Sequence, residues 1–317
     1  MGTTADKLNK IAETKEAIKQ AIINKGVDVS ANTPFSDYPK KISAITGSGE
    51  GGSGGIAMDS FYNARTNNGT SYSGLFAYYL IDNLDLSGFD TSNVTSMNQM
   101  FIYCSNLTSL DLSSFDTSNV TNMEGMFYYC SKLTTLDLSN FDVFNVVDMK
   151  NMFNGCSNLT SLDLSSFDTS KVTNMNQMFY NCSKLTTLDL SNFDVSNVIN
   201  MKSMFRECKT LTSLDLSGWN PSSVTSTDDM FYYCNKLTEL DLSNFDLSNC
   251  TSNGNMFTNC TALHTLRLDN CDYATIKKTI ISLPTGTISG KTKTIYCKEE
   301  NATGLTPPKN WVFSYVE

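Results

Sequence analysis

The sequence predicts an α/β solenoid, in which short coils of chain stack on one another behind an N-terminal helical segment. The first observation is a spacing of 26 residues between seven cysteines, which are Cys104, Cys130, Cys156, Cys182, Cys208, Cys234 and Cys260. The second is that a whole motif travels with each cysteine: a Leu-Asp-Leu triplet, a Phe-Asp corner and a Met-x-x-Met-Phe-x-x-Cys segment. Self-similarity at a fixed period is typical of stacked repeats, which bury one continuous core.

Each part of the repeat has an expected local structure. The Leu-Asp-Leu triplet at 110–112 predicts a short parallel strand with both leucines inward and the aspartate outward, because strand side chains alternate. Asp116, followed by Thr-Ser-Asn, predicts an Asx-type turn. Residues 120–130 have helical or 3₁₀ spacing of their apolar side chains.

The repeats divide the chain into parts. Residues 56–270 form the predicted array, and residues 271–317, where the period breaks, are expected to cap it with a helix near Ile276 and two strands. Residues 47–55 are a Gly/Ser linker, either natural or introduced. Aligned backwards by 26, Gly74 and Tyr78 take the places of Met100 and Cys104, so the first coil is expected to be degenerate, as in a terminal repeat.

Residues 1–46 are predicted to be a helical attachment or oligomerisation segment. A helix is expected over 4–25, with an apolar seam that consists of Leu8, Ile11, Ile18 and Ile22. A single short helix is marginal alone, so this seam must pack against other copies or a larger assembly. The alternative is a helix folded back on the end of the solenoid.

Charge and composition exclude several classes of partner. The formal net charge is -9, and an acidic body argues against binding nucleic acid, which requires a basic face. No run approaches the roughly 18 apolar residues of a membrane span, so membrane insertion is not expected. The first residues do not resemble a secretory leader.

The cysteines have two interpretations. Stacked coils bring neighbouring sulfurs within bridging distance, which permits disulfides. Each ladder cysteine nevertheless lies between apolar positions, which favours buried free thiols that act as small hydrophobes. No metal is expected, because the chain has no Cys-x-x-Cys pair and its only histidine is His264.

Two rows of side chains are candidates for a ligand surface. The strand aspartates Asp111, Asp137, Asp163 and Asp189 are expected to stack on one face, where they bind a cation or form a solvated, hydrogen-bonded row. The residues between Phe and Cys vary from coil to coil and include Tyr103, Tyr128, Tyr129, Tyr180, Tyr232 and Tyr233. These tyrosines are expected either to stack on sugars and anchor a protein, or merely to cover the ridge.

Catalysis is not expected. General acid–base chemistry requires acids in unlike environments, whereas each repeat carboxylate has near-identical copies. No phosphate loop, nucleophile elbow or Cys-His pairing occurs, and no cofactor is predicted.

The repeat closely resembles the BspA-like leucine-rich repeats, in their Leu-Asp-Leu-Ser-x-Phe-Asp-Thr-Ser-x-Val-Thr-x-Met-x-x-Met-Phe-x-x-Cys form. The resemblance covers about 190 residues. It implies a leucine-rich repeat solenoid of the kind found mainly on microbial surface proteins that adhere to hosts or matrix.

Residues 15–42 resemble the N-terminal module of bacteriophage tail or head-fibre proteins, through Lys-Glu-Ala-Ile-Lys and Thr-Pro-Phe-Ser-x-Tyr-Pro. This resemblance implies attachment to virion proteins, a homotrimer, and assembly in a host cytoplasm. The function expected from both resemblances is a non-enzymatic virion fibre or appendage that binds a cell-surface glycan or protein. The alternative is a bacterial cell-surface adhesin.

Overall fold

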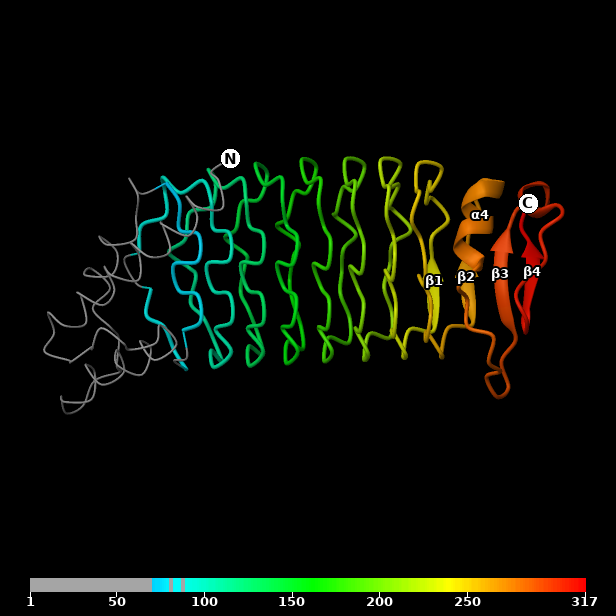
Figure 1. Ribbon diagram of the computed structural model, residues 1–317, viewed down its shortest axis with the longest axis horizontal. Coiled ribbons are helices and arrows are strands. Elements are labelled where there is room, and N and C mark those ends of the chain that lie inside the picture. Colours follow the sequence, from blue (N-terminus) through cyan, green and yellow to red (C-terminus); the bar gives the residue numbers. More distant parts are fainter. Residues whose placement is uncertain (1–69, 80–81, 87–88) are drawn as a thin grey trace, which may run out of the picture.

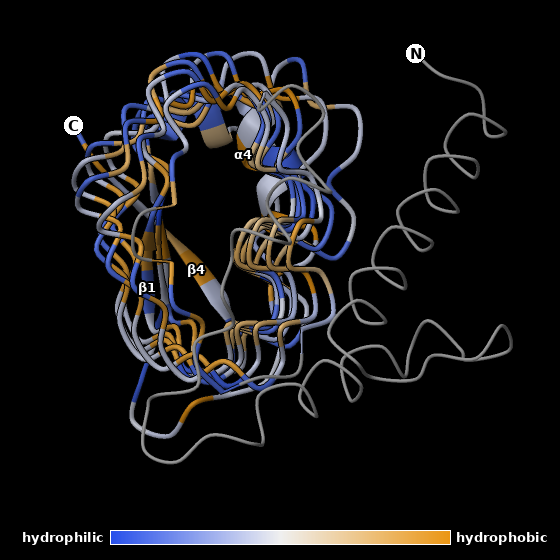
Figure 2. Cartoon of the chain, turned by 90° about the vertical axis from the view of Figure 1, so that its left-hand side faces the viewer, coloured by the Kyte–Doolittle hydropathy of each residue, from blue (hydrophilic) through white to orange (hydrophobic). Residues whose placement is uncertain are grey.

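The computed structural model describes residues 70–79, 82–86 and 89–317, which form one row of stacked coils (Figure 1). The call for an oligomerisation seam and the Gly/Ser linker lie outside these residues. Viewed along the row, the coils superpose around a shared interior, with β1 and β4 on one wall and α4 at a corner (Figure 2).

The regular elements gather at the C-terminal end. The strands are β1 (Glu239–Asp241), β2 (Thr265–Arg267), β3 (Lys293–Cys297) and β4 (Trp311–Tyr315), and the helices are α4 (Tyr273–Ile280) and α5 (Glu299–Ala302). The four strands form one parallel sheet in chain order. In the described ranges, no helix is long and apolar enough to cross a bilayer.

The Leu-Asp-Leu triplets place their side chains as predicted. Leu110 and Leu112 are buried while Asp111 between them is exposed. This alternation directs one leucine pair per coil into the core and leaves the aspartates facing solvent. At the C-terminal end the triplet row passes directly into the sheet, because Asp215 pairs with Asp241 of β1.

The segment expected to be helical or 3₁₀ consists of consecutive tight turns. Met126 N–H donates to the carbonyl of Met123, three residues back, at 3.1 Å, as in a 3₁₀ turn. The next N–H, of Phe127, instead leaves the coil and donates to the Met152 carbonyl of the following coil at 2.9 Å. Alternate N–H groups therefore close turns and join coils, so a continuous helix does not form.

Two residues per coil are left-handed, which makes this alternation possible. Their φ angles lie between 55° and 78°. The first set is Gln99, Gly125, Asn151, Gln177, Ser203, Asp229 and Asn255, and the second is Tyr103, Tyr129, Gly155, Asn181, Glu207, Tyr233 and Asn259. Most are not glycine, so the hydrogen bonds between coils must offset the cost of about 1 kcal/mol or more for each left-handed residue.

The first described coil is one residue shorter than the 26-residue alignment assumes. Ser71 pairs with Ser96, and Phe76 stacks on Phe101 at 5.4 Å. Tyr78 therefore corresponds to Tyr103 and not to Cys104, and the expected alignment of this coil is wrong by one position. The reason is physical: a 25-residue step places an aromatic ring beneath Phe101.

The core is built from columns of like side chains. One phenylalanine per coil forms a continuous stack with centroid distances of 5.4–5.8 Å and interplanar angles of 4–10°. Its members are Phe76, Phe101, Phe127, Phe153, Phe179, Phe205, Phe231 and Phe257. Each coil thus completes the core of its neighbours, which is the architecture of a leucine-rich repeat solenoid and confirms the predicted fold class.

The corners also follow the predicted turn chemistry. Asp116 Oδ1 accepts hydrogen bonds from Ser118 N–H at 3.0 Å and from the Ser118 hydroxyl at 2.6 Å. The same Asx turn recurs at Asp90, Asp142, Asp168, Asp194 and Asp246. Past the last coil, Asp272 performs the related task of capping α4, accepting from Thr275 N–H.

Candidate ligand-binding surface

The cysteine ladder is part of the core and not part of a site. All ten cysteines in the chain are free and buried. Each ladder thiol donates to a phenylalanine carbonyl of the preceding coil, such as Cys182 Sγ to Phe153 O at 3.2 Å. The disulfide interpretation is therefore wrong, and the prediction of buried thiols is confirmed, with an intercoil hydrogen bond that the sequence does not reveal.

Burial also makes these thiols unreactive. Desolvation raises the pKa of Cys104, Cys156, Cys208 and Cys260 to about 12. It raises the pKa of Cys130, Cys182 and Cys234 well above the ordinary value as well, with neighbouring thiols adding to the effect. The thiolate is the nucleophile and the metal ligand, so the ladder supplies neither function at neutral pH.

The strand aspartates lie exposed in a row but satisfy themselves locally. Asp111, Asp137, Asp163 and Asp189 each accept the N–H of the serine two residues on, at 2.9–3.0 Å. The Ser139 N–H and hydroxyl lower the pKa of Asp137, and this effect outweighs repulsion from the neighbouring carboxylates. The expectation that the row raises its own pKa values is therefore wrong.

No cation is needed to hold this row. Among the residues that the structure describes, no three His, Cys, Asp or Glu side chains gather closely enough to hold a metal ion. The row is a hydrogen-bonded, solvated face with carboxylates that remain ionised at neutral pH.

The variable tyrosines form a continuous ridge along one corner of the solenoid. Tyr78, which the sequence-based set does not include, stacks on Tyr103 at 5.1 Å, and Tyr103 stacks on Tyr129 at 5.2 Å. Tyr128 meets Tyr103 edge-to-face at 5.4 Å. We call this ridge, with Tyr180, Tyr232 and Tyr233 farther along, the tyrosine ridge.

A charged residue links the far part of the ridge. The Arg206 guanidinium lies 4.2 Å from the Tyr232 ring centroid and 5.8 Å from that of Tyr180. Asp229 holds this guanidinium by an ion pair of 2.8 Å. Stacked rings with a cation held between them are the side chains most often found at the centres of binding interfaces.

The ridge keeps its hydroxyl protons at physiological pH. Desolvation by neighbouring rings, with the charges of Tyr103 and Tyr129, raises the pKa of Tyr128 to about 12. Desolvation raises the pKa of Tyr129 too. These hydroxyls are therefore available as both hydrogen-bond donors and acceptors beside a broad apolar surface.

Four ridge tyrosines occupy left-handed backbone positions. Tyr78, Tyr103, Tyr129 and Tyr233 have φ angles of 57–63°. Other coils place Asn181, Asn259 and Gly155 at the equivalent position, and these residue types adopt it at less cost. The ridge thus retains bulky aromatic side chains where the backbone favours smaller ones.

The fold and the ridge define a leucine-rich repeat solenoid with an aromatic surface along one corner. Residues 70–162 and 147–270, together more than half of the chain, match one protein family. The chain belongs to this family, which is described as "Mycoplasma protein of unknown function, DUF285". No curated protein matches the chain.

Three solved structures are similar to the chain. An internalin, InlF, from Listeria monocytogenes is 13% identical, with a TM-score of 0.30 over 96% of this chain and 90% of that one. The functional domain of InlJ from Listeria monocytogenes, which includes a cysteine ladder, is 17% identical, with a TM-score of 0.24 over 68% and 61%. A leucine-rich repeat protein from Bacteroides ovatus is 13% identical, with a TM-score of 0.17 over 69% and 86%.

Proposed function

We propose that this chain is a non-catalytic adhesion protein that acts at a cell surface and binds a protein or glycan through the tyrosine ridge. The observation that carries the proposal is the set of exposed, stacked tyrosines at left-handed positions. A residue retained despite backbone strain points to a role beyond folding. Tyrosine supplies a large, rigid, amphipathic contact surface at low entropic cost.

The surface location rests on the resemblance of the repeats to BspA-like proteins. The virion location rests on residues 15–42, which lie outside the described part of the chain, so we favour the cell surface. On intact cells that produce the protein, we expect an antibody against the solenoid to label the outer surface. Labelling only after the cells are permeabilised would contradict this location.

The ridge is tested by replacing tyrosines with the residue that other coils use. In the full chain, Tyr103→Asn, Tyr129→Asn and Tyr233→Asn together should leave the free energy of unfolding unchanged or higher, because Asn fits the left-handed position. We expect binding of the labelled protein to epithelial cells and extracellular matrix to fall about tenfold or more, since such aromatic anchors carry most of the binding energy.

The matched control is Tyr273→Ala, which removes an exposed tyrosine of α4 away from the ridge. It should bind like the wild-type chain. Equal binding by the triple variant and the wild-type chain would show that the ridge is only a cover for the corner.

We also propose that the N-terminal seam makes the protein a trimer that presents three solenoids. Light scattering should give a mass near three times the 35.0 kDa of one chain. Replacing Ile11 and Ile18 by lysine should reduce that mass to one chain, because charges at seam positions oppose helix association. A monomeric wild-type chain would leave the segment as an attachment peptide and refute the trimer.

A further inference from the structure

A groove opens where the repeats meet α4, away from the tyrosine ridge. It has a volume of about 610 Å³, within the range of small-molecule sites. Gly218 opens it, because earlier coils have a serine or asparagine at this position, as in Ser166 and Asn192. A side chain at Gly218 would meet nothing within 4 Å of its Cβ.

The groove contains amides that are released from the task they perform elsewhere. In a regular coil, the Asn192 side chain donates to the Leu164 and Phe167 carbonyls of the preceding coil at 3.0 and 2.8 Å. At the groove, the Cys271 thiol lies at 3.1 Å from Leu242 O and 3.3 Å from Phe245 O, the equivalent carbonyls. These carbonyls therefore no longer need an amide.

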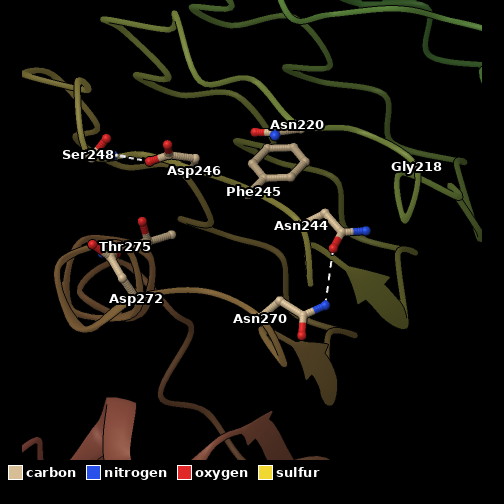
Figure 3. A pocket seen from close by; sticks show the side chains of 9 residues that line it. All are labelled: Gly218, Asn220, Asn244, Phe245, Asp246, Ser248, Asn270, Asp272 and Thr275. Atoms are coloured by element: carbon tan, nitrogen blue, oxygen red, sulfur yellow. Dashed lines mark hydrogen bonds between the residues drawn. The ribbon is translucent and has the colours of Figure 1, made fainter.

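The released side chains line the groove (Figure 3). Asn270 Nδ2 donates to Asn244 Oδ1 at 3.1 Å, and Asn244 Nδ2 donates to Ser217 O at 2.6 Å. The Asn220 side chain makes no hydrogen bond within the described ranges, so its donors and its acceptor are all available.

Two carboxylates complete the lining. Asp246 Oδ1 accepts from Ser248 N–H at 2.8 Å, and Asp272 Oδ1 accepts from Thr275 N–H at 2.7 Å. In the described part of the chain, the second oxygen of each carboxylate accepts no hydrogen bond. The nearby Lys278 ammonium donates to three carbonyls, among them Leu247 O at 2.7 Å, and does not line the groove.

This set of groups selects the chemical class of the ligand. Carboxylates without a cation repel anions, which excludes phosphates and acidic sugars. An ammonium group is a donor only, so it would pair with the carboxylates but leave the amide N–H groups of Asn220 and Asn270 without an acceptor. A hydroxyl both donates and accepts, and therefore satisfies amides and carboxylates together.

We propose that this groove binds a neutral saccharide. Asn220 and Asn270 donate to its hydroxyl oxygens, and Asp246 and Asp272 accept its hydroxyl protons. The site is independent of the tyrosine ridge and of the proposed adhesion function.

The test is calorimetric titration of the full chain with neutral trisaccharides (maltotriose, cellotriose and mannotriose) and with two charged probes, trilysine and trigalacturonate. We expect at least one neutral trisaccharide to bind and neither charged probe to do so. Gly218→Asn should weaken that binding tenfold or more, because it restores the repeat side chain and fills the groove. Asn220→Ala leaves the groove open and should weaken binding severalfold.

The control is Gly286→Ala, another position whose added Cβ meets nothing within 4 Å. It should bind like the wild-type chain. Binding of trilysine alone, binding of no probe, or saccharide binding that Gly218→Asn leaves unchanged would each overturn the proposal. In the last case, loss of binding in the ridge variant would place the saccharide on the tyrosines instead.

Discussion

The free energy of unfolding of this protein is expected to fall steeply above pH 9, because the cysteine ladder holds its protons only in the folded state. Four ladder thiols have a folded pKa of about 12, against an ordinary value of 9.0. Above pH 9 the unfolded chain loses these protons and the folded chain keeps them. The unfolded state then binds fewer protons, so stability decreases as pH rises.

The size of the effect follows from the number of thiols. The contribution is fully present below pH 9 and is lost between about pH 9 and 12. At pH 10 each such thiol costs about 1 kcal/mol, so the seven-membered ladder costs roughly 5–10 kcal/mol. That loss equals much of the stability of a typical domain, and we expect the solenoid to unfold between pH 10 and 11.

Urea denaturation under reducing conditions at pH 8 and pH 10, followed by circular dichroism, measures this loss. Cys208→Ala is the informative variant. It should be less stable at pH 8, since it lacks the Cys208 Sγ donor to Phe179 O, but should lose about 1 kcal/mol less between the two pH values. Equal stability of the wild-type chain at both pH values would contradict the role assigned to the thiols.

Much of this architecture is predictable because a fixed period transfers one interpretation to every coil. The 26-residue spacing identifies the buried Phe127 and Met126 and the outward Asp111, since stacked coils must place equivalent residues in equivalent surroundings. The corner turn at Asp116 follows from local side-chain chemistry alone. The helix and strands after residue 271 lie where apolar spacing predicts them.

The features that escape prediction depend on contacts between coils. Residues such as Gln99 and Glu207 carry no local signal for a left-handed backbone, which arises because alternate N–H groups bond the next coil. Tyr78 joins the ridge only because the first step is 25 residues long. The groove depends on a glycine and a thiol from different coils, Gly218 and Cys271, which only the stacked structure brings together.

The second large effect is expected from Phe153→Ala, which interrupts the phenylalanine stack in the middle of the solenoid. Phe153 is fully buried, and its ring centroid lies 5.8 Å from that of Phe127 and 5.7 Å from that of Phe179. Removing the ring weakens both of its intercoil interfaces, because each coil contacts only its neighbours. We expect the free energy of unfolding to fall by about 3–5 kcal/mol.

A matched control lies nine residues away along the chain. The Phe144 side chain is 45% exposed, and its ring contacts Lys171 Nζ at 3.7 Å. Phe144→Ala should change stability by less than about 1 kcal/mol, because it removes a surface cation–π contact and opens no cavity. Urea denaturation at pH 7 compares the two variants. If both lost the same stability, the stacked rings would not be what joins the coils, and the intercoil backbone hydrogen bonds would have to hold the solenoid together.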